Sequence, residues 1–177
     1  YIPWQDVKQR YRRSVLGHFW ITLSIAIFVF MIGALWSRLF NIEMSEYLPY
    51  FAVSIIVWTF ISGVINEAPV VYITSQSIIK QVNMPFSSYV FALVVKHCII
   101  FAHNIIVFIA VSIYYKHNFL SYLHLTLLAV LIIVFTSVWV SILLGIANAR
   151  FRDVGQLVPT ITQIAVFVTP IIWKPEL

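Results

Sequence analysis

The sequence predicts an all-α protein that crosses a membrane several times. Hydrophobic residues make up 62% of the chain and charged residues only 10%, whereas soluble domains average roughly 25% charged residues. The mean hydropathy is +0.96, and a chain of 177 residues cannot hide that much apolar surface in one water-soluble core. The apolar residues also gather in long runs with few charges, which indicates helices surrounded by lipid.

Five apolar runs come close to the ~20 residues that a helix needs to cross a bilayer. We predict membrane spans over residues 19–40, 47–66, 90–115, 122–149 and 154–173. The first run is too long for a secretory signal and has no small-residue cleavage site. The chain does not begin with Met, so we expect it to start within a longer protein.

Residues 1–17, before the first span, have the pattern of an amphipathic helix lying in the membrane interface. Trp4, Val7, Tyr11 and Val15 recur at helical spacing, while basic side chains occupy the rest of the circumference. A plain basic anchor beside the first span explains the same pattern without further function.

Basic residues in the loops predict the orientation. With the N-terminus in the cytoplasm, the inside segments hold seven of them and the outside segments three, Arg38, Lys116 and Lys174. The positive-inside rule therefore favours a cytoplasmic N-terminus. Lys96 lies within the third run, and snorkelling to the cytoplasmic interface is favoured there over a charge that lines a pathway.

Three features interrupt the runs. Residues 70–83 have helical periodicity and end at Asn83-Met84-Pro85, so we expect a short cytoplasmic helix that either docks a partner or floats on the membrane. Arg150, Arg152 and Asp153 form a charged cytoplasmic turn, in which Arg152 and Asp153 are expected to pair or to cap the next helix. Thr169-Pro170 is expected to bend the last span, with Thr169 satisfying a freed carbonyl.

The chemistry of an enzyme is not apparent. All acidic residues lie at or beyond the ends of the runs, and His97 and His103 are spaced so that they do not share a helix face. We expect no metal site, since no ligand cluster accompanies them. Cys98 is the one cysteine, so no intrachain disulfide can form. The basic residues flank apolar runs and form no patch for nucleic acid.

Several strings resemble the permeases of type-2 ATP-binding-cassette exporters for O-antigen, capsule or teichoic-acid polymers. The most specific is Arg10-Tyr11-Arg12-Arg13-Ser14-Val15-Leu16-Gly17, followed by Phe19-Trp20. Weaker strings follow in the family's order over nearly the whole chain, namely Tyr50-Phe51, Trp58-Thr59-Phe60, Ile78-Ile79-Lys80, Met84-Pro85, Arg152-Asp153 and Thr169-Pro170-Ile171 with Trp173. The family would continue beyond Leu177 into a sixth helix.

The resemblance implies a multi-pass permease of the bacterial inner (cytoplasmic) membrane that pairs with a second copy. Each copy would rest on a separate ATPase subunit, which binds ATP and Mg, so this chain needs no cofactor of its own. The coupling segment would comprise Ser75, Ser77, Ile78, Ile79, Lys80, Val82 and Pro85. The entrance for a lipid-linked polysaccharide would involve Arg10, Tyr11, Arg12 and Arg13.

Aromatic residues make up 16% of the chain, and their rings can stack on sugars. Phe28, Trp36 and Phe167 lie on the first and fifth runs, which border the pathway in the family. Aromatic residues are also ordinary in membrane spans, and membrane-interface belts are the favoured explanation for them. The open alternatives are a drug or ion exporter of the same permease type, and a membrane scaffold that recruits a partner through its cytoplasmic loop.

Overall fold

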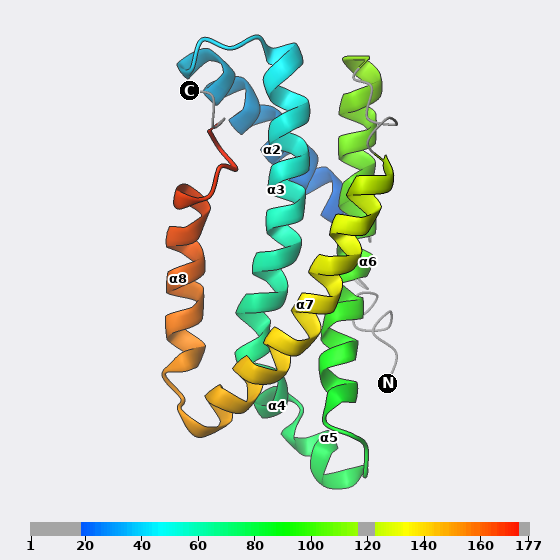
Figure 1. Ribbon diagram of the computed structural model, residues 1–177, viewed down its shortest axis with the longest axis vertical. Helices are drawn as coiled ribbons and strands as arrows, with labels where there is room; N and C mark the ends of the chain where they lie inside the picture. Colours follow the sequence, from blue (N-terminus) through cyan, green and yellow to red (C-terminus); the bar gives the residue numbers. More distant parts are fainter. Residues whose placement is uncertain (1–18, 117–122, 174–177) are drawn as a thin grey trace.

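The computed structural model describes residues 19–116 and 123–173, and it is helical with no strand in these ranges. Within these ranges, four helices are long and apolar enough to cross a membrane. They are α2 (Phe19–Leu39), α3 (Met44–Glu67), α6 (Ser87–Tyr114) and α7 (Leu123–Arg150). Helices α3 and α6 run along the long axis of the molecule, whereas α2 and α7 are inclined to it (Figure 1). The predicted all-helical, multi-pass class is confirmed. These helix ends differ from the predicted bounds by at most three residues.

The outer faces of these helices are apolar. On α7, Leu131 is 66% exposed and Phe135 is 76% exposed. A soluble monomer rarely exposes continuous apolar surface of this extent. This apolar surface is therefore suited to contact with the lipid hydrocarbon of a membrane.

Helix α3 is the centre of the bundle and contacts α2, α6, α7 and α8. One buried cluster forms around Tyr47, Phe51 and Ile56 near the α2–α3 connection, and a second forms around Val64 and Val90 toward the other end. Gly33 lets α2 approach α3 closely, because an added Cβ would overlap Leu48. Small residues at helix contacts are typical of membrane bundles, where dispersion between close backbones drives association.

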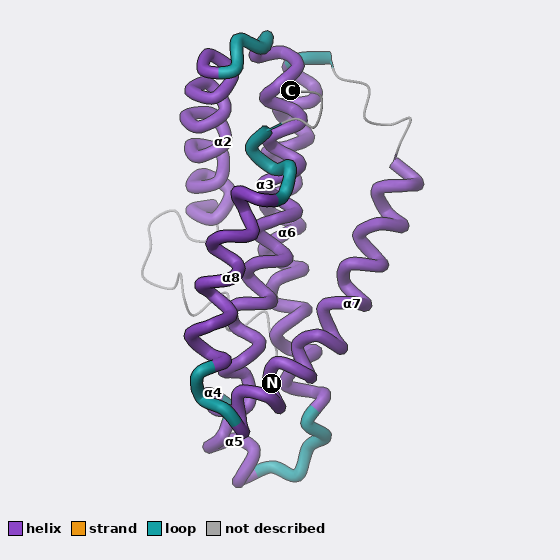
Figure 2. Tube along the Cα trace, turned by 60° about the vertical axis from the view of Figure 1, so that its left-hand side comes forward, coloured by secondary structure: helices purple, strands orange, loops and turns teal. Residues whose placement is uncertain are grey.

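Helix α7 contacts the bundle mainly through its C-terminal half and leans away from it toward its start (Figure 2). Its buried residues are Ser137, Ser141, Gly145 and Asn148, which recur at helical spacing along one stripe. At Gly145 an added Cβ would lie 2.6 Å from Cε2 of Tyr72. The small stripe therefore brings the end of α7 into direct contact with the segment that follows α3.

The single helix predicted over residues 70–83 is wrong. Helix α3 continues directly into a 3-10 turn, η1 (Ala68–Val70), and then into two short helices, α4 (Val71–Thr74) and α5 (Gln76–Gln81). The break lies at Ser75, whose φ and ψ are −90° and 4°. The chain becomes extended at Val82, as expected shortly before a proline.

The fifth predicted span is also shorter than expected, because α8 (Val154–Val168) has 15 residues. At 1.5 Å per residue it covers about 22 Å, less than the ~30 Å hydrocarbon core. Thr169 is extended, and its ψ is 141°. The hydroxyl groups that reach the freed carbonyls come from α3 and not from Thr169. The Tyr47 hydroxyl donates to the carbonyl of Ile172. The Tyr50 hydroxyl donates to the carbonyl of Pro170 over 2.6 Å.

Candidate functional site

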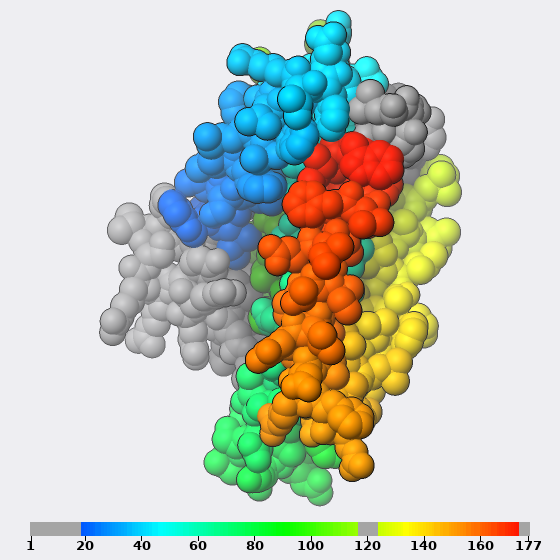
Figure 3. All heavy atoms as spheres, turned by 90° about the vertical axis from the view of Figure 1, so that its left-hand side faces the viewer, coloured from blue at the N-terminus to red at the C-terminus, as the bar shows by residue number. Residues whose placement is uncertain are grey.

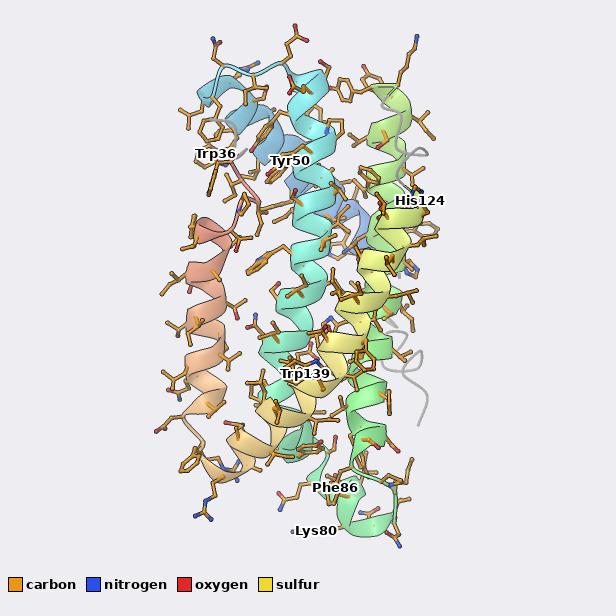
Figure 4. The ribbon with its side chains drawn as sticks, viewed as in Figure 1. Trp36, Tyr50, Lys80, Phe86, His124 and Trp139 are labelled. Atoms are coloured by element: carbon orange, nitrogen blue, oxygen red, sulfur yellow. The ribbon has the colours of Figure 1, made fainter. Side chains whose placement is uncertain are left out.

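The end of the bundle that carries α4 and α5 brings together several polar and charged side chains from different helices. The α7–α8 turn lies at this same end, as the space-filling view shows (Figure 3). Lys80 and Phe86 lie there as well, whereas Trp36 and Tyr50 lie toward the opposite end (Figure 4).

Helix α5 has one polar exposed face and one apolar face turned to the bundle. Gln76, Ser77, Lys80 and Gln81 are exposed. Ile78 and Ile79 are half-buried and pack against the second core cluster. The predicted coupling residues therefore divide into two groups: Ser77, Lys80, Val82 and Pro85 are exposed, and Ser75, Ile78 and Ile79 are half-buried.

Two grooves separate α4 and α5 from α6. A groove of about 350 Å³ runs beside Ile78, Met84 and Phe91, and one of about 370 Å³ lies between α4 and α6 and contains Lys96. Tyr89 lies between them and lines both. The α4–α5 segment is thus only partly packed on α6, and few buried contacts are what allow a segment to shift as a unit.

A charged cluster fastens the end of α3 to α6. Lys96 forms an ion pair with Glu67, and its snorkelling to the cytoplasmic interface stays a prediction. Nε2 of His97 lies 3.5 Å from the other Glu67 oxygen. The His97 ring fits against α3 because residue 63 is glycine, where an added Cβ would lie 2.7 Å from the ring.

The turn between α7 and α8 exposes Arg150, Arg152 and Asp153. The predicted pairing of Arg152 with Asp153 is wrong, since they form no ion pair with each other in the described structure. Asp153 occupies the N-cap position of α8, but its side chain makes no capping hydrogen bond. The Arg150 guanidinium instead lies 5.9 Å from the Phe151 ring centroid.

Asn148 supplies the cap that Asp153 does not. The backbone N–H of Gly155, in the first turn of α8, donates to Oδ1 of Asn148 over 2.8 Å. Nδ2 of the same side chain donates to the carbonyl of Pro69 in η1 over 2.9 Å. Asn148 is 2% exposed, so one buried side chain joins η1, α7 and α8.

Helix α8 has a polar stripe on an exposed face. Gln156, Thr160, Gln163 and Phe167 are all exposed and recur at helical spacing. Two amides on the exposed face of an apolar helix are costly against hydrocarbon, because lipid offers them no hydrogen-bond partner. This stripe therefore faces something more polar than lipid.

The three predicted pathway aromatics occupy different surroundings. Phe28 is 43% exposed, and its ring centroid lies 6.3 Å from that of Phe51. Trp36 stacks on Phe40 at 5.2 Å. Phe167 is 65% exposed on α8. The predicted interfacial helix of residues 1–17, with Arg10, Tyr11, Arg12 and Arg13, lies outside the described residues.

Within residues 19–116 and 123–173, no group of three His, Cys, Asp or Glu side chains could hold a metal ion. Cys98 is a free, half-buried thiol.

The bundle and its polar end define a helical membrane domain that presents a short helical loop at one end. The chain belongs to the ABC-2 type transporter family, which matches it over residues 1–177. It is therefore a transport permease and not itself an enzyme. The chain is similar to the O-antigen export system permease protein RfbA of Klebsiella pneumoniae, with 23% identity over 175 residues, 98% of this chain and 67% of the relative.

Sequence reasoning missed Asn148 and the pairing of Glu67 with Lys96. No local pattern distinguishes a buried asparagine near a helix end from an exposed one. The stripe on α8 could have been found, because Gln156, Thr160 and Gln163 are polar positions at helical spacing within an apolar run.

Proposed function

We propose that this chain is the permease subunit of an ATP-driven exporter that moves a lipid-linked polysaccharide across the bacterial cytoplasmic membrane. O-antigen is the first candidate cargo, because a similar protein has that name, and capsule and teichoic-acid polymers have related chemistry. Two copies would enclose the pathway. Each would dock a separate ATPase subunit, which binds ATP and Mg.

The observation that carries the docking role is the division of α5 into two faces. Ser77 and Lys80 are exposed on one face, while Ile78 and Ile79 attach the helix to the bundle. A short helix that is anchored on one side and polar on the other suits a soluble partner. Arg150 and Arg152 are exposed at the same end and widen the basic surface available to an ATPase.

The α8 stripe supports a polar, sugar-like cargo. The amides of Gln156 and Gln163 offer both donors and acceptors, which match the hydroxyl groups of a sugar. Phe167 adds an aromatic face at one end of the stripe. Arg10, Arg12 and Arg13 would bind the pyrophosphate of the lipid carrier, because guanidinium groups form bidentate hydrogen bonds with phosphate oxygens.

The docking role is tested by combining Ser77→Glu with Lys80→Glu in the permease, co-expressed with its ATPase and reconstituted in vesicles. We expect ATP-dependent export to fall at least about tenfold, the loss typical when central interface contacts are removed. The matched control combines Ser45→Glu with Arg38→Glu, which changes one exposed serine and one exposed cation at the other end of the bundle. Normal export by the α5 variant would refute docking at α5.

The cargo is tested by adding candidate substrates to the reconstituted complex and measuring ATP hydrolysis. A lipid-linked sugar polymer should stimulate hydrolysis, and the carrier lipid alone should do so less. Stimulation by small apolar drugs in its place would assign the chain to drug export. A permease that neither binds an ATPase nor alters hydrolysis would be a scaffold.

A further inference from the structure

We propose that Asn148 is the positioning residue that transmits movement of the α4–α5 segment to α8. This inference rests on the proposed function, because it explains how a displacement at the docking helix reaches the helix with the polar stripe. The juxtaposition that carries it is the pair of hydrogen bonds from Asn148 to Pro69 and Gly155.

The first step lies between α5 and η1. Only α4 and Ser75 separate α5 from Val70, the last residue of η1. A partner that pushes on the exposed face of α5 therefore acts on η1 through about one and a half helical turns of chain. Ala68 and Pro69 in η1 are buried, so η1 cannot move without its neighbours in the bundle.

The second step lies between α7 and the segment formed by η1 and α4, which pack closely against each other. Val71 and Tyr72 pack on Gly145 so closely that an added Cβ would lie 2.6 Å from the Tyr72 ring and 3.1 Å from Cγ1 of Val71. Closely packed interfaces move between discrete arrangements and do not deform continuously. The end of α7 therefore follows a displacement of η1 and α4.

The third step lies between α7 and α8, and it depends on hydrogen bonds, which are directional, as well as on packing. Asn148 bonds to Pro69 on one side and caps the first turn of α8 through Gly155 on the other. The bond to Pro69 is buried and the bond to Gly155 is partly buried, so breaking either one leaves a polar group poorly satisfied. A linked movement that keeps both bonds is the less costly response, and it changes the tilt of α8.

Helix α8 also packs directly on η1 and on α3, whereas the two other polar features near this path do not link η1 to α8. The Glu67–Lys96 pair joins the end of α3 to α6 and not to α8. Asp153 makes no capping bond on α8. Among the side-chain hydrogen bonds of the described residues, Asn148 thus provides the direct polar path from η1 to α8.

The test uses the permease–ATPase complex with Asn148→Leu, which removes both bonds at similar volume, and Asn148→Asp, which keeps the acceptor for Gly155 but loses the donor to Pro69. We expect both variants to lower the amount of polymer exported per ATP hydrolysed by about tenfold, within the usual range of coupling between sites. The matched control is Ser141→Ala, which removes a buried hydroxyl without a partner from the same face of α7, and its ratio should equal that of the wild type.

A second readout separates transmission from simple capping or loss of stability. Single cysteines at Ser77 and Thr160, in a Cys98→Ser background, are labelled with maleimide with and without ATP. In the chain that retains Asn148, ATP should change the labelling rate at both positions. In the Asn148→Leu and Asn148→Asp variants the change at Ser77 should persist and the change at Thr160 should disappear.

Several outcomes would overturn the inference. One is a wild-type ratio of export to hydrolysis in either Asn148 variant. Another is an ATP response at Ser77 without one at Thr160 in the chain that retains Asn148, a result that requires no Asn148 variant to fold. If the wild-type complex itself shows neither ATP-dependent export nor ATPase binding, the proposed function fails, and that outcome is distinct from failure at Asn148.

Discussion

Glu67 illustrates how a single charged residue is accommodated at the edge of the apolar bundle. Its carboxylate pairs with Lys96, and its side chain is 39% exposed while that of Lys96 is 21% exposed. An ion pair that is partly shielded from water is worth more than one on the surface, and removal of one partner leaves the other with an uncompensated charge. The pair therefore stabilises the junction between α3 and α6.

We expect Lys96→Met to lower the free energy of unfolding by about 1–3 kcal/mol, because hydrogen bonds to charged groups contribute on that scale. The exchange of Glu67→Lys with Lys96→Glu should recover part of this loss. A thermal unfolding series on the purified permease, analysed as a double-mutant cycle, measures the coupling between the two positions. Strictly additive losses from the single variants would show that the pair makes no energetic contribution.

At the scale of elements, the end of α8 depends on α3. Helix α8 stops before Pro170, and the carbonyls of the turn that follows lie outside the helix. Tyr47 and Tyr50, one helical turn apart on α3, reach these carbonyls with their hydroxyls. The break in the last helix is therefore tolerated because a neighbouring helix satisfies its backbone.

Tyr47→Phe should lower the unfolding temperature by roughly 3–6 °C, since it leaves the carbonyl of Ile172 without its donor. Tyr89→Phe is the matched control, because Tyr89 is also buried but its hydroxyl has no partner in the described structure. This control should be neutral or slightly stabilising in the same thermal unfolding assay. Equal effects of the two substitutions would contradict the role assigned to the Tyr47 hydroxyl.

At the scale of the whole molecule, charge differs between the two ends of the bundle. The α4–α5 end exposes Lys80, Arg150 and Arg152 with Asp153. Among the described residues, the opposite end exposes two cations, Arg38 and Lys116. This asymmetry favours a cytoplasmic location for the α4–α5 end.

Vesicles of known sidedness provide the test of orientation. In a Cys98→Ser background, a cysteine at Ser77 should react with a membrane-impermeant maleimide only in inside-out vesicles. A cysteine at Glu43, which is exposed between α2 and α3, should react only in right-side-out vesicles. Reaction of the Ser77 position from outside would place α5 away from any cytoplasmic ATPase.

The sequence alone was enough to predict the membrane class and the helices. Each long apolar run between charged residues indicates by itself that the segment lies in lipid, whatever its neighbours are. It also predicted that the segment between α3 and α6 is helical, since the spacing of Ile78 and Ile79 is local information. The interruption at Ser75 and the end of α8 at Val168 were not predicted, because they depend on how these segments meet α6, α7 and α3.

Only the tertiary structure decided which polar residues act together. Lys96 follows Glu67 by 29 positions, and Asn148 follows Pro69 by 79, so no local pattern could connect them. Their pairing arises because α3, α6 and α7 meet at one end of the bundle, where the low dielectric makes each buried polar group seek a partner. The composition of each apolar run is enough to show that it needs lipid around it. The hydrogen bonds and ion pairs that would transmit force depend on contacts between runs.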